Sequence, residues 1–518
     1  MFKEDENRYQ RAVIREISAE ASCDYVIPDY LGEVRKMLFT EARCLPLPTY
    51  MSGEEICASG AVEFRMIYTD AEGRLSSVTF SEDYECCERV SADDLPEISS
   101  ESEISSFSMR LLGPRKISAK ARVSTNARLH FAEGVELCGT AAELPTLERA
   151  ERRISVMNDL EGEPFEREYA EAITELEGVI LDDARVIHER AECRILECRA
   201  AEGEVWVSGE HIISALIALG DEPARVYEKA IPFAETLKLG GASEDMTASV
   251  SAIYPSLKIE ITPNDLGSSV CASFITEYIP RASGNRPMQI TTDAYLTDRE
   301  CECRYSELVL GHFLERRSAE DTIDLPLDFE SLSLEMPESI LFITAEPRIR
   351  STELADGTLK ILSDIRFSGI ACEVNGEEAR SYAQLRHTAE HTKEITLADG
   401  CAGEVLPEVC VVMSDVKGRV EDGRVVLSAR LNYTAKLTSK DKYRYLSEID
   451  SIGEPEEKKK NGKISVYYPD TEDTLFDVAR KFRTTAERVA IDNSLTEAAI
   501  ADGCSPASLV GVDMLIIK

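Results

Sequence analysis

The sequence predicts a mainly β fold made of tandem repeat domains, followed by a small α+β unit at the C-terminal end. Three observations support this prediction: related segments recur about every 150 residues, turn residues separate apolar runs, and helical periodicity is concentrated near the end of the chain. The chain has 518 residues, which is too long for one hydrophobic core. We therefore expect several domains.

The repeat is marked by Gly53, Gly203 and Gly357, which are 150 and 154 residues apart (203 − 53 and 357 − 203). Each glycine precedes a long apolar-rich run, a turn and a second run. The turns are "DAEG", "GDEP" and "NGEE", whose residues favour chain reversal. These segments predict β-hairpins. A period near 150 residues is too long for a solenoid that shares one core, so we expect each repeat to form a small sandwich or barrel.

The repeats and the linker signals set the predicted boundaries. The charged segment "SIGEPEEKKKNG" contains Gly and Pro and few apolar residues, as is typical of a linker. The segments 136–164 and 281–324 could be either linkers or extra strands. The predicted parts are β-rich repeats at 12–135, 165–280 and 325–445, a charged linker at 449–462 and a terminal unit at 463–518.

The terminal unit shows a β-α-α-β pattern. "KISVYY" is a strand candidate, and Leu475, Val478, Ala479 and Phe482 fall on one face of a helix. The closing "SLVGVDMLIIK" supplies a turn and a second strand.

Capping residues define the two predicted helices. Asp473 or Thr474 can cap the first helix. Thr484 and Glu487 have the spacing of a capping box, which would open the second helix.

The charge of the chain limits its partners. There are 58 basic and 96 acidic residues, which gives a formal net charge of -38. Such a surface repels phosphate polyanions and anionic membranes, so we expect no nucleic-acid partner. No basic segment leading into an apolar run stands at the start, and no run of 18 apolar residues occurs, so we expect neither secretion nor membrane insertion, and a cytoplasmic protein.

The 15 cysteines include no CxxC pair, which favours reduced, mostly buried thiols. Two metal sites are alternatives: Cys301, Cys303 and His312 could converge on zinc, and His387 and His391 would share a face if they lay on a helix. The spacing of Cys301, Cys303 and His312 fits no common zinc module, and the repeat alignment places His387 and His391 in a strand or hairpin end. Phosphate-binding and nucleophile motifs are also missing from the sequence. We therefore predict no metal, no cofactor and no enzyme activity.

The terminal unit resembles the LysM family. The matching pieces are "EDTL", "VARKF", "TT", "IDN" and "LVGVDMLII", with Glu472 where the family usually has glycine. The resemblance implies a βααβ LysM fold and binding of N-acetylglucosamine polymers, or of a partner, by two loops. The implied site residues are Asp473, Thr474, Leu475, Ile491, Asp492 and Asn493. Helix capping by Asp473 and Thr474, and core packing by Leu475, are the structural alternatives.

The repeats resemble SPOCS domains, on the segments "DYVIPDYLGEVRKMLFTEARCLP" and "ASGAVEFRMIYTDAEGRLSSVTFSEDYE". Three SPOCS-like units followed by one LysM-like unit is the arrangement of a clostridial family of spore-morphogenesis proteins. The resemblance implies a scaffold of spore coat assembly in the mother-cell cytoplasm, at the forespore surface. Its implied partner is the coat-basement ATPase SpoIVA, bound through the LysM-like unit. The alternative function is peptidoglycan binding by that unit, with the β domains as spacers.

Overall fold

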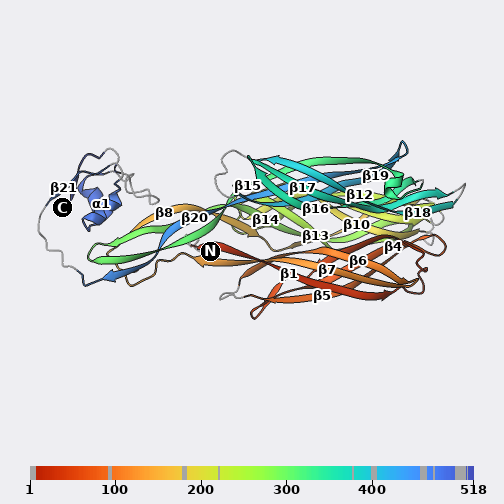
Figure 1. Ribbon diagram of the computed structural model, residues 1–518, viewed down its shortest axis with the longest axis horizontal. Coiled ribbons are helices and arrows are strands. Elements are labelled where there is room, and N and C mark those ends of the chain that lie inside the picture. Colours follow the sequence, from red (N-terminus) through yellow and green to blue (C-terminus); the bar gives the residue numbers. More distant parts are fainter. Residues whose placement is uncertain are drawn as a thin grey trace.

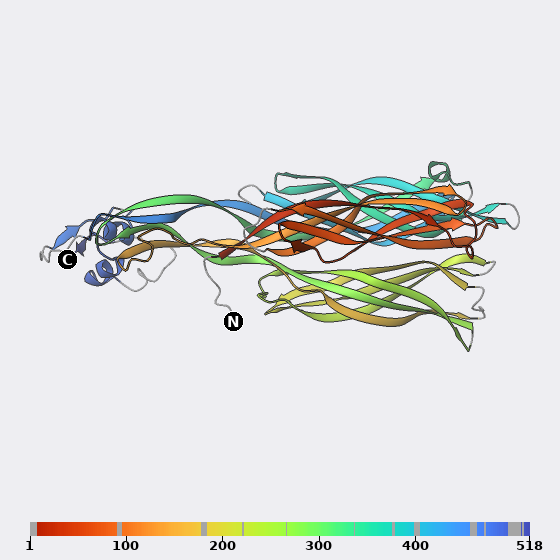
Figure 2. The ribbon, with the colours of Figure 1, turned by 90° about the horizontal axis from the view of Figure 1, so that it is seen from below.

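The computed structural model describes residues 8–90, 96–177, 184–219, 222–265, 267–335, 337–375, 379–397, 405–455, 464–470, 473–495, 509 and 512–517. The molecule is elongated and has a body of β-sandwiches, a narrower stalk and a C-terminal module (residues 464–517) beside the stalk tip (Figures 1 and 2). Most of the described residues lie in strands, so the prediction of a mainly β fold is confirmed.

Unit 1 of the body consists of two facing antiparallel sheets. One has the strand order β1-β7-β6, and in the other β4 pairs with β2, β3 and β5. The bounds are β1 (Arg8–Val26), β2 (Lys36–Pro46), β3 (Tyr50–Ser52), β4 (Glu55–Thr69), β5 (Leu75–Arg89), β6 (Glu97–Gly113) and β7 (Lys116–Gly134).

Units 2 and 3 repeat this architecture. In unit 2, β9-β14-β13 faces β10-β11-β12, and in unit 3, β15-β20-β19 faces β16-β17-β18. The strands of unit 2 are β9 (Phe165–Glu177), β10 (Ala184–Ala201), β11 (Glu204–Leu219), β12 (Glu222–Lys238), β13 (Thr247–Asn264) and β14 (Gly267–Leu296). Those of unit 3 are β15 (Glu300–Asp328), β16 (Pro337–Ala355), β17 (Thr358–Asn375), β18 (Ala379–Thr396), β19 (Val405–Glu421) and β20 (Arg424–Ile452), with a 3-10 turn η2 (Phe329–Leu332).

The glycines that mark the sequence repeat lie in equivalent turns. Gly53, Gly203 and Gly357 have φ angles of 63°, 74° and 71°, in the left-handed region that favours glycine. Each lies in the turn just before the central strand of its sheet, which is β4, β11 or β17. In these strands buried side chains alternate with partly exposed ones, as in β11, so one face of the sheet packs on its partner sheet.

Each unit has its own apolar core between its two sheets. The buried side chains include Phe64 and Ile117 in unit 1, Ile217 and Phe274 in unit 2, and Phe367 and Leu431 in unit 3.

A further cluster, the apolar junction, joins the three units at the end of the body remote from the stalk. Phe39 from β2, His188 from β10 and Phe342 from β16 meet there. The ring centroids of Phe39 and Phe342 are 5.2 Å apart, and those of His188 and Phe342 are 4.4 Å apart. Around them pack Leu38, Ile67, Ile187, Leu216 and Ile370.

A register shift of the same kind precedes each of the three rings of the apolar junction. The strand register shifts between Met37 and Phe39, between Val186 and His188, and between Ile340 and Phe342. A bulge bends its strand and re-aims the next side chain. The contacts between units are also cyclic: β2 packs on β18, β10 on β5 and β16 on β12. The units therefore form a closed ring with approximate threefold symmetry.

Ion pairs join the units at the stalk end of the body. Arg281 of unit 2 pairs with Glu101 of unit 1 at 3.0 Å, and Lys436 of unit 3 pairs with Asp159 of the stalk strand β8 at 2.6 Å. Apolar contacts and ion pairs therefore both hold the ring together, since His188 of the apolar junction also pairs with Glu41 of unit 1.

The stalk consists of two antiparallel ribbons packed face to face (Figure 1). In one, β8 (Leu147–Glu161) pairs with residues 281–296 of β14. In the other, residues 300–311 of β15 pair with residues 440–452 of β20. Leu296 and Ile449 pack between the ribbons. At about 3.3 Å per residue the stalk is about 40 Å long.

The segments 136–164 and 281–324, for which the sequence allowed either linkers or extra strands, contribute strands to the stalk. Part of 136–164 forms β8, and 281–324 contributes to β14 and β15. The predicted linker at 449–462 begins too early, because residues up to Ile452 pair with β15. Its residues 456–462 lie outside the described part of the chain, and the domain boundaries otherwise stay predictions.

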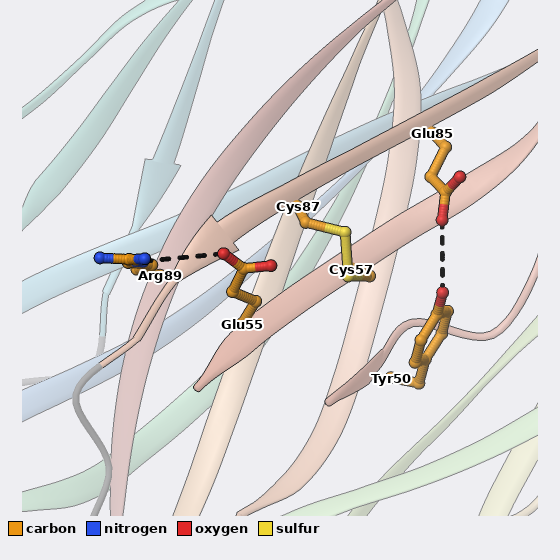
Figure 3. The surroundings of a disulfide bond; sticks show 6 residues. All are labelled: Tyr50, Glu55, Cys57, Glu85, Cys87 and Arg89. Atoms are coloured by element: carbon orange, nitrogen blue, oxygen red, sulfur yellow. Dashed lines mark hydrogen bonds and ion pairs between the residues drawn. A yellow bond between two sulfur atoms is a disulfide. The ribbon is translucent and has the colours of Figure 1, made fainter. Parts of the chain in front are cut away.

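The expectation of reduced cysteines is wrong for Cys57 and Cys87, which form a disulfide (Figure 3). The two residues lie directly opposite on β4 and β5, with Cα atoms 4.1 Å apart. The ion pair between Glu55 and Arg89 lies on the same two strands. Sequence spacing could not reveal this pair, because the strand register brings it together.

Candidate functional site

The C-terminal module has the predicted β-α-α-β order. It consists of β21 (Ser465–Tyr467), α1 (Leu475–Lys481), α2 (Ala486–Asp492) and β22 (Leu515–Ile517), and β21 pairs antiparallel with β22. Leu475, Val478, Ala479, Val489, Ala490 and Leu515 form its core. Its membership of the LysM family stays a prediction.

The helix caps differ in one place from the prediction. Thr474 caps α1 and forms a capping box with Asp477. The second cap is Thr485, which accepts a hydrogen bond from the Arg488 N–H, so the predicted box of Thr484 and Glu487 is wrong. The Thr484 carbonyl instead accepts a hydrogen bond from a stalk residue.

That stalk residue is Tyr295 of β14, which organises the joint between the module and the stalk. Its hydroxyl donates to the Thr484 carbonyl at 2.7 Å, and its ring meets that of Phe476 edge-on, with centroids 5.0 Å apart. Tyr295 is only 4% exposed. Burial raises the pKa of Tyr295 above its ordinary value, so its hydroxyl stays a donor.

Two ion pairs surround Tyr295. Arg480 binds Asp293 at 2.6 Å, and Arg483 binds Glu300 at 3.1 Å. Both arginines lie at or just after the C-terminal end of α1. The stalk therefore holds the module by the side of α1 at Phe476 and by the turn between the helices, and the two predicted binding loops lie at the ends of α1 and α2 remote from that turn.

In the first predicted loop, the three site residues support the fold. Asp473 accepts hydrogen bonds from the Asp470 N–H and the Tyr467 hydroxyl, and these two bonds lower its pKa. Thr474 is the cap of α1, and Leu475 is 3% exposed. Glu472 lies outside the described residues.

In the second predicted loop, the three residues have different environments. The Asn493 side chain binds both backbone groups of Ile516: its Oδ1 accepts from the N–H at 2.6 Å and its Nδ2 donates to the carbonyl at 2.8 Å. Asp492 is the last residue of α2. Ile491 is 65% exposed, so of these six side chains it is the most open to a ligand.

The sequence reading missed the outer edge of β21. Ile464, Val466 and Tyr468 are 66%, 50% and 70% exposed, and Met514 beside β22 is 46% exposed. The inward residue Tyr467 packs on Phe482 and Lys481. The alternation in "ISVYY" contains this signal, because every second residue of a strand faces the same side.

The two suggested metal sites are not assembled. Cys303 donates to the Ala294 carbonyl, and burial raises its pKa to about 12. His387 and His391 lie on strand β18, and His391 instead contacts Tyr433 and Asp321. Within the described residues, no group of three potential ligands is close enough to hold a metal ion.

The body contains a buried histidine in unit 2. His211 is fully buried between the hydroxyls of Tyr254 and Tyr278, at 2.8 and 2.7 Å. Burial lowers its pKa to about 4. The equivalent residues of units 1 and 3 are the core residues Val62 and Ile365. His211 is therefore a neutral member of the core and is closed to substrates.

Across the described residues, no helix is long and apolar enough to cross a membrane. Comparison of the chain with protein-family models, with curated proteins and with solved structures finds no match.

Proposed function

We propose that the protein is a non-catalytic scaffold of spore envelope assembly, of the SipL type, and that its C-terminal module binds the coat-basement ATPase SpoIVA. By this proposal it acts in the mother-cell cytoplasm at the forespore surface. The motif resemblances of the repeats and the terminal unit motivate the proposal. The observation that supports it best is the mounting of the module, in which the stalk contacts α1 and the turn after it while Ile491, near the end of α2, is left exposed.

The local geometry favours a protein over a glycan as the partner. Thr474, Leu475 and Asn493, which would bind sugar by the family pattern, are engaged in caps, core and backbone bonds. Ile491, two residues before Asn493, is an exposed apolar group beside them. Apolar side chains that become buried are the usual source of affinity in a protein interface.

The test is binding of the full chain to purified SpoIVA and, in parallel, sedimentation with insoluble peptidoglycan. We expect saturable binding to the ATPase. Ile491→Asp should weaken it about tenfold or more, since burial of an isoleucine contributes about 1.5–3 kcal/mol. Leu196→Asp is the matched control, because Leu196 is 64% exposed in the body.

Two outcomes would reject the proposal. Sedimentation with peptidoglycan without ATPase binding would replace it by the glycan-binding alternative. Equal weakening by Ile491→Asp and Leu196→Asp would show that the module is not the binding site. Binding that weakens with added salt would further indicate a basic patch on the partner.

A further inference from the structure

We propose that β21 is a docking edge, to which a partner protein adds an extended, basic and apolar segment as a new β-strand. This inference rests on the proposed function and names the way the module would hold its partner. It follows from the backbone geometry of the module, from its exposed side chains and from its charge.

The hydrogen bonds of Asn493 show which way the strands face. They engage the N–H and the carbonyl of Ile516, so these groups point away from β21. Val466 lies directly opposite Ile516. In an antiparallel pair such residues form a non-hydrogen-bonded pair, so the N–H and carbonyl of Val466 point away from β22.

The two edges of this small sheet are therefore different. Asn493 covers the edge of β22 as a strand would, by one donor and one acceptor. At the edge of β21, no described residue bonds to the backbone of Val466. A strand with unpaired backbone groups is a template for another strand.

The side chains along the β21 edge suit an apolar segment. Ile464, Val466 and Tyr468 alternate along the chain, so they share the outward face and offer backbone groups to the same edge. All three are at least half exposed. Alternate apolar residues of an added strand would lie beside them on the same face of the sheet.

The charges near this edge favour basic residues in the segment. Asp470 follows Tyr468 by two residues, and Asp513 lies just before the start of the neighbouring strand β22; both are exposed. Asp473 is bonded to the Tyr467 hydroxyl at the same end of β21. Among the described basic residues of α1 and the following turn, Arg480 and Arg483 face the stalk, and Lys481 lies over the Tyr467 ring on the inward face of β21. A partner segment with lysine or arginine near this end would be complementary.

The decisive variant is Val466→Pro in the full chain. Proline removes the outward N–H and obstructs an added strand, yet it leaves the bonds to β22, which involve the neighbouring residues Ser465 and Tyr467. Val466→Thr is the matched control, because it keeps the backbone donor and a β-branched side chain. Thermal unfolding of both variants checks that the module stays folded.

The probe is a fluorescein-labelled peptide of ten alternating lysine and valine residues, followed by fluorescence anisotropy. We expect it to bind the Val466→Thr chain at least about tenfold more tightly than the Val466→Pro chain, because backbone bonds are lost. A ratio near one, or no binding to the wild-type chain, would overturn the docking edge. If the ratio is tenfold but SpoIVA does not bind, the docking edge stands and the proposed partner is wrong.

Discussion

The apolar junction of the body and the joint between the module and the stalk connect parts of the chain in different ways. The apolar junction draws on all three units and buries Phe39 and Phe342 to below 10% exposure. The module joint has a smaller apolar contact, in which Tyr295 and Ala150 of the stalk join the module's core cluster, and two ion pairs whose arginines are 47% and 37% exposed. Exposed ion pairs contribute little, about 0–1 kcal/mol. The comparison teaches that the body should unfold as one piece, whereas the module is separable from it.

The strongest way to break the apolar junction is Phe39→Ala. It removes the ring that contacts both His188 and Phe342, and should lower the free energy of unfolding of the body by about 3–5 kcal/mol. Urea unfolding measures the change. Phe165→Ala is the control, because Phe165 is 38% exposed. Equal effects of the two changes would mean that the units do not depend on the junction.

The second prediction concerns the Cys57–Cys87 disulfide, a covalent link within the body that the module joint does not have. It bridges a sequence separation of 30 residues. Cys87→Ser should lower the free energy of unfolding by about 2–4 kcal/mol, while Cys410→Ser, at an exposed free thiol, should have little effect.

Thiol alkylation in intact cells checks the same bond under the proposed conditions. Disulfides are rare in reducing compartments. Alkylation of both Cys57 and Cys87 in the cell would show that the disulfide forms only after extraction. The disulfide would then not contribute to the stability of the body in the cell.

The third prediction is that the stability of the body depends on pH more strongly than that of the module joint. His211 is neutral in the folded state, with its pKa lowered to about 4 by burial. Below its ordinary pKa of about 6.5 the unfolded chain binds one more proton, so stability falls as pH falls. The loss from His211 should be about 2 kcal/mol between pH 7.5 and pH 5.

Urea unfolding at these two pH values, with the wild type and His211→Gln, measures this contribution. The variant should lack that part of the pH dependence. Identical pH dependence in both chains would show that His211 is not held neutral in the core. The module joint, built from arginines and carboxylates, should change little over the same range.

The smallest effect is expected at the module joint. Arg480→Glu replaces the ion pair with Asp293 by a like-charge contact, and should free the module while changing the global free energy of unfolding by less than about 1 kcal/mol. Hydrogen exchange at the turn between α1 and α2 would detect the release. Arg480→Lys keeps the charge and should retain the protection. Unchanged exchange in Arg480→Glu would show that Tyr295 alone suffices.

Local signals in the sequence predicted the local structure well. Gly53, Gly203 and Gly357 marked the repeat because each occupies a turn that needs a positive φ. The apolar spacing from Leu475 predicted α1, since its core face has helical periodicity. Such features depend on a few neighbouring residues, so the sequence shows them directly.

Long-range features could not be predicted in this way. Phe39, His188 and Phe342 occupy related segments, but nothing near them in the sequence indicates that they meet. The sequence alone does not distinguish Thr484 from Thr485 as the cap of α2. In the structure Thr485 is the cap, and the Thr484 carbonyl accepts a hydrogen bond from Tyr295, which lies 189 residues upstream. The predicted binding residues Asp473 and Asn493 are likewise occupied by partners that only the fold supplies.

The closed ring of units limits how the protein could grow into a larger structure. A head-to-tail contact that did not close would let copies polymerise without end, whereas here β2, β10 and β16 each already pack on another unit of the same chain. The body therefore has no contact of this kind left for a second molecule. Any lattice that contained the protein would have to be propagated by other surfaces than the contacts that close this ring.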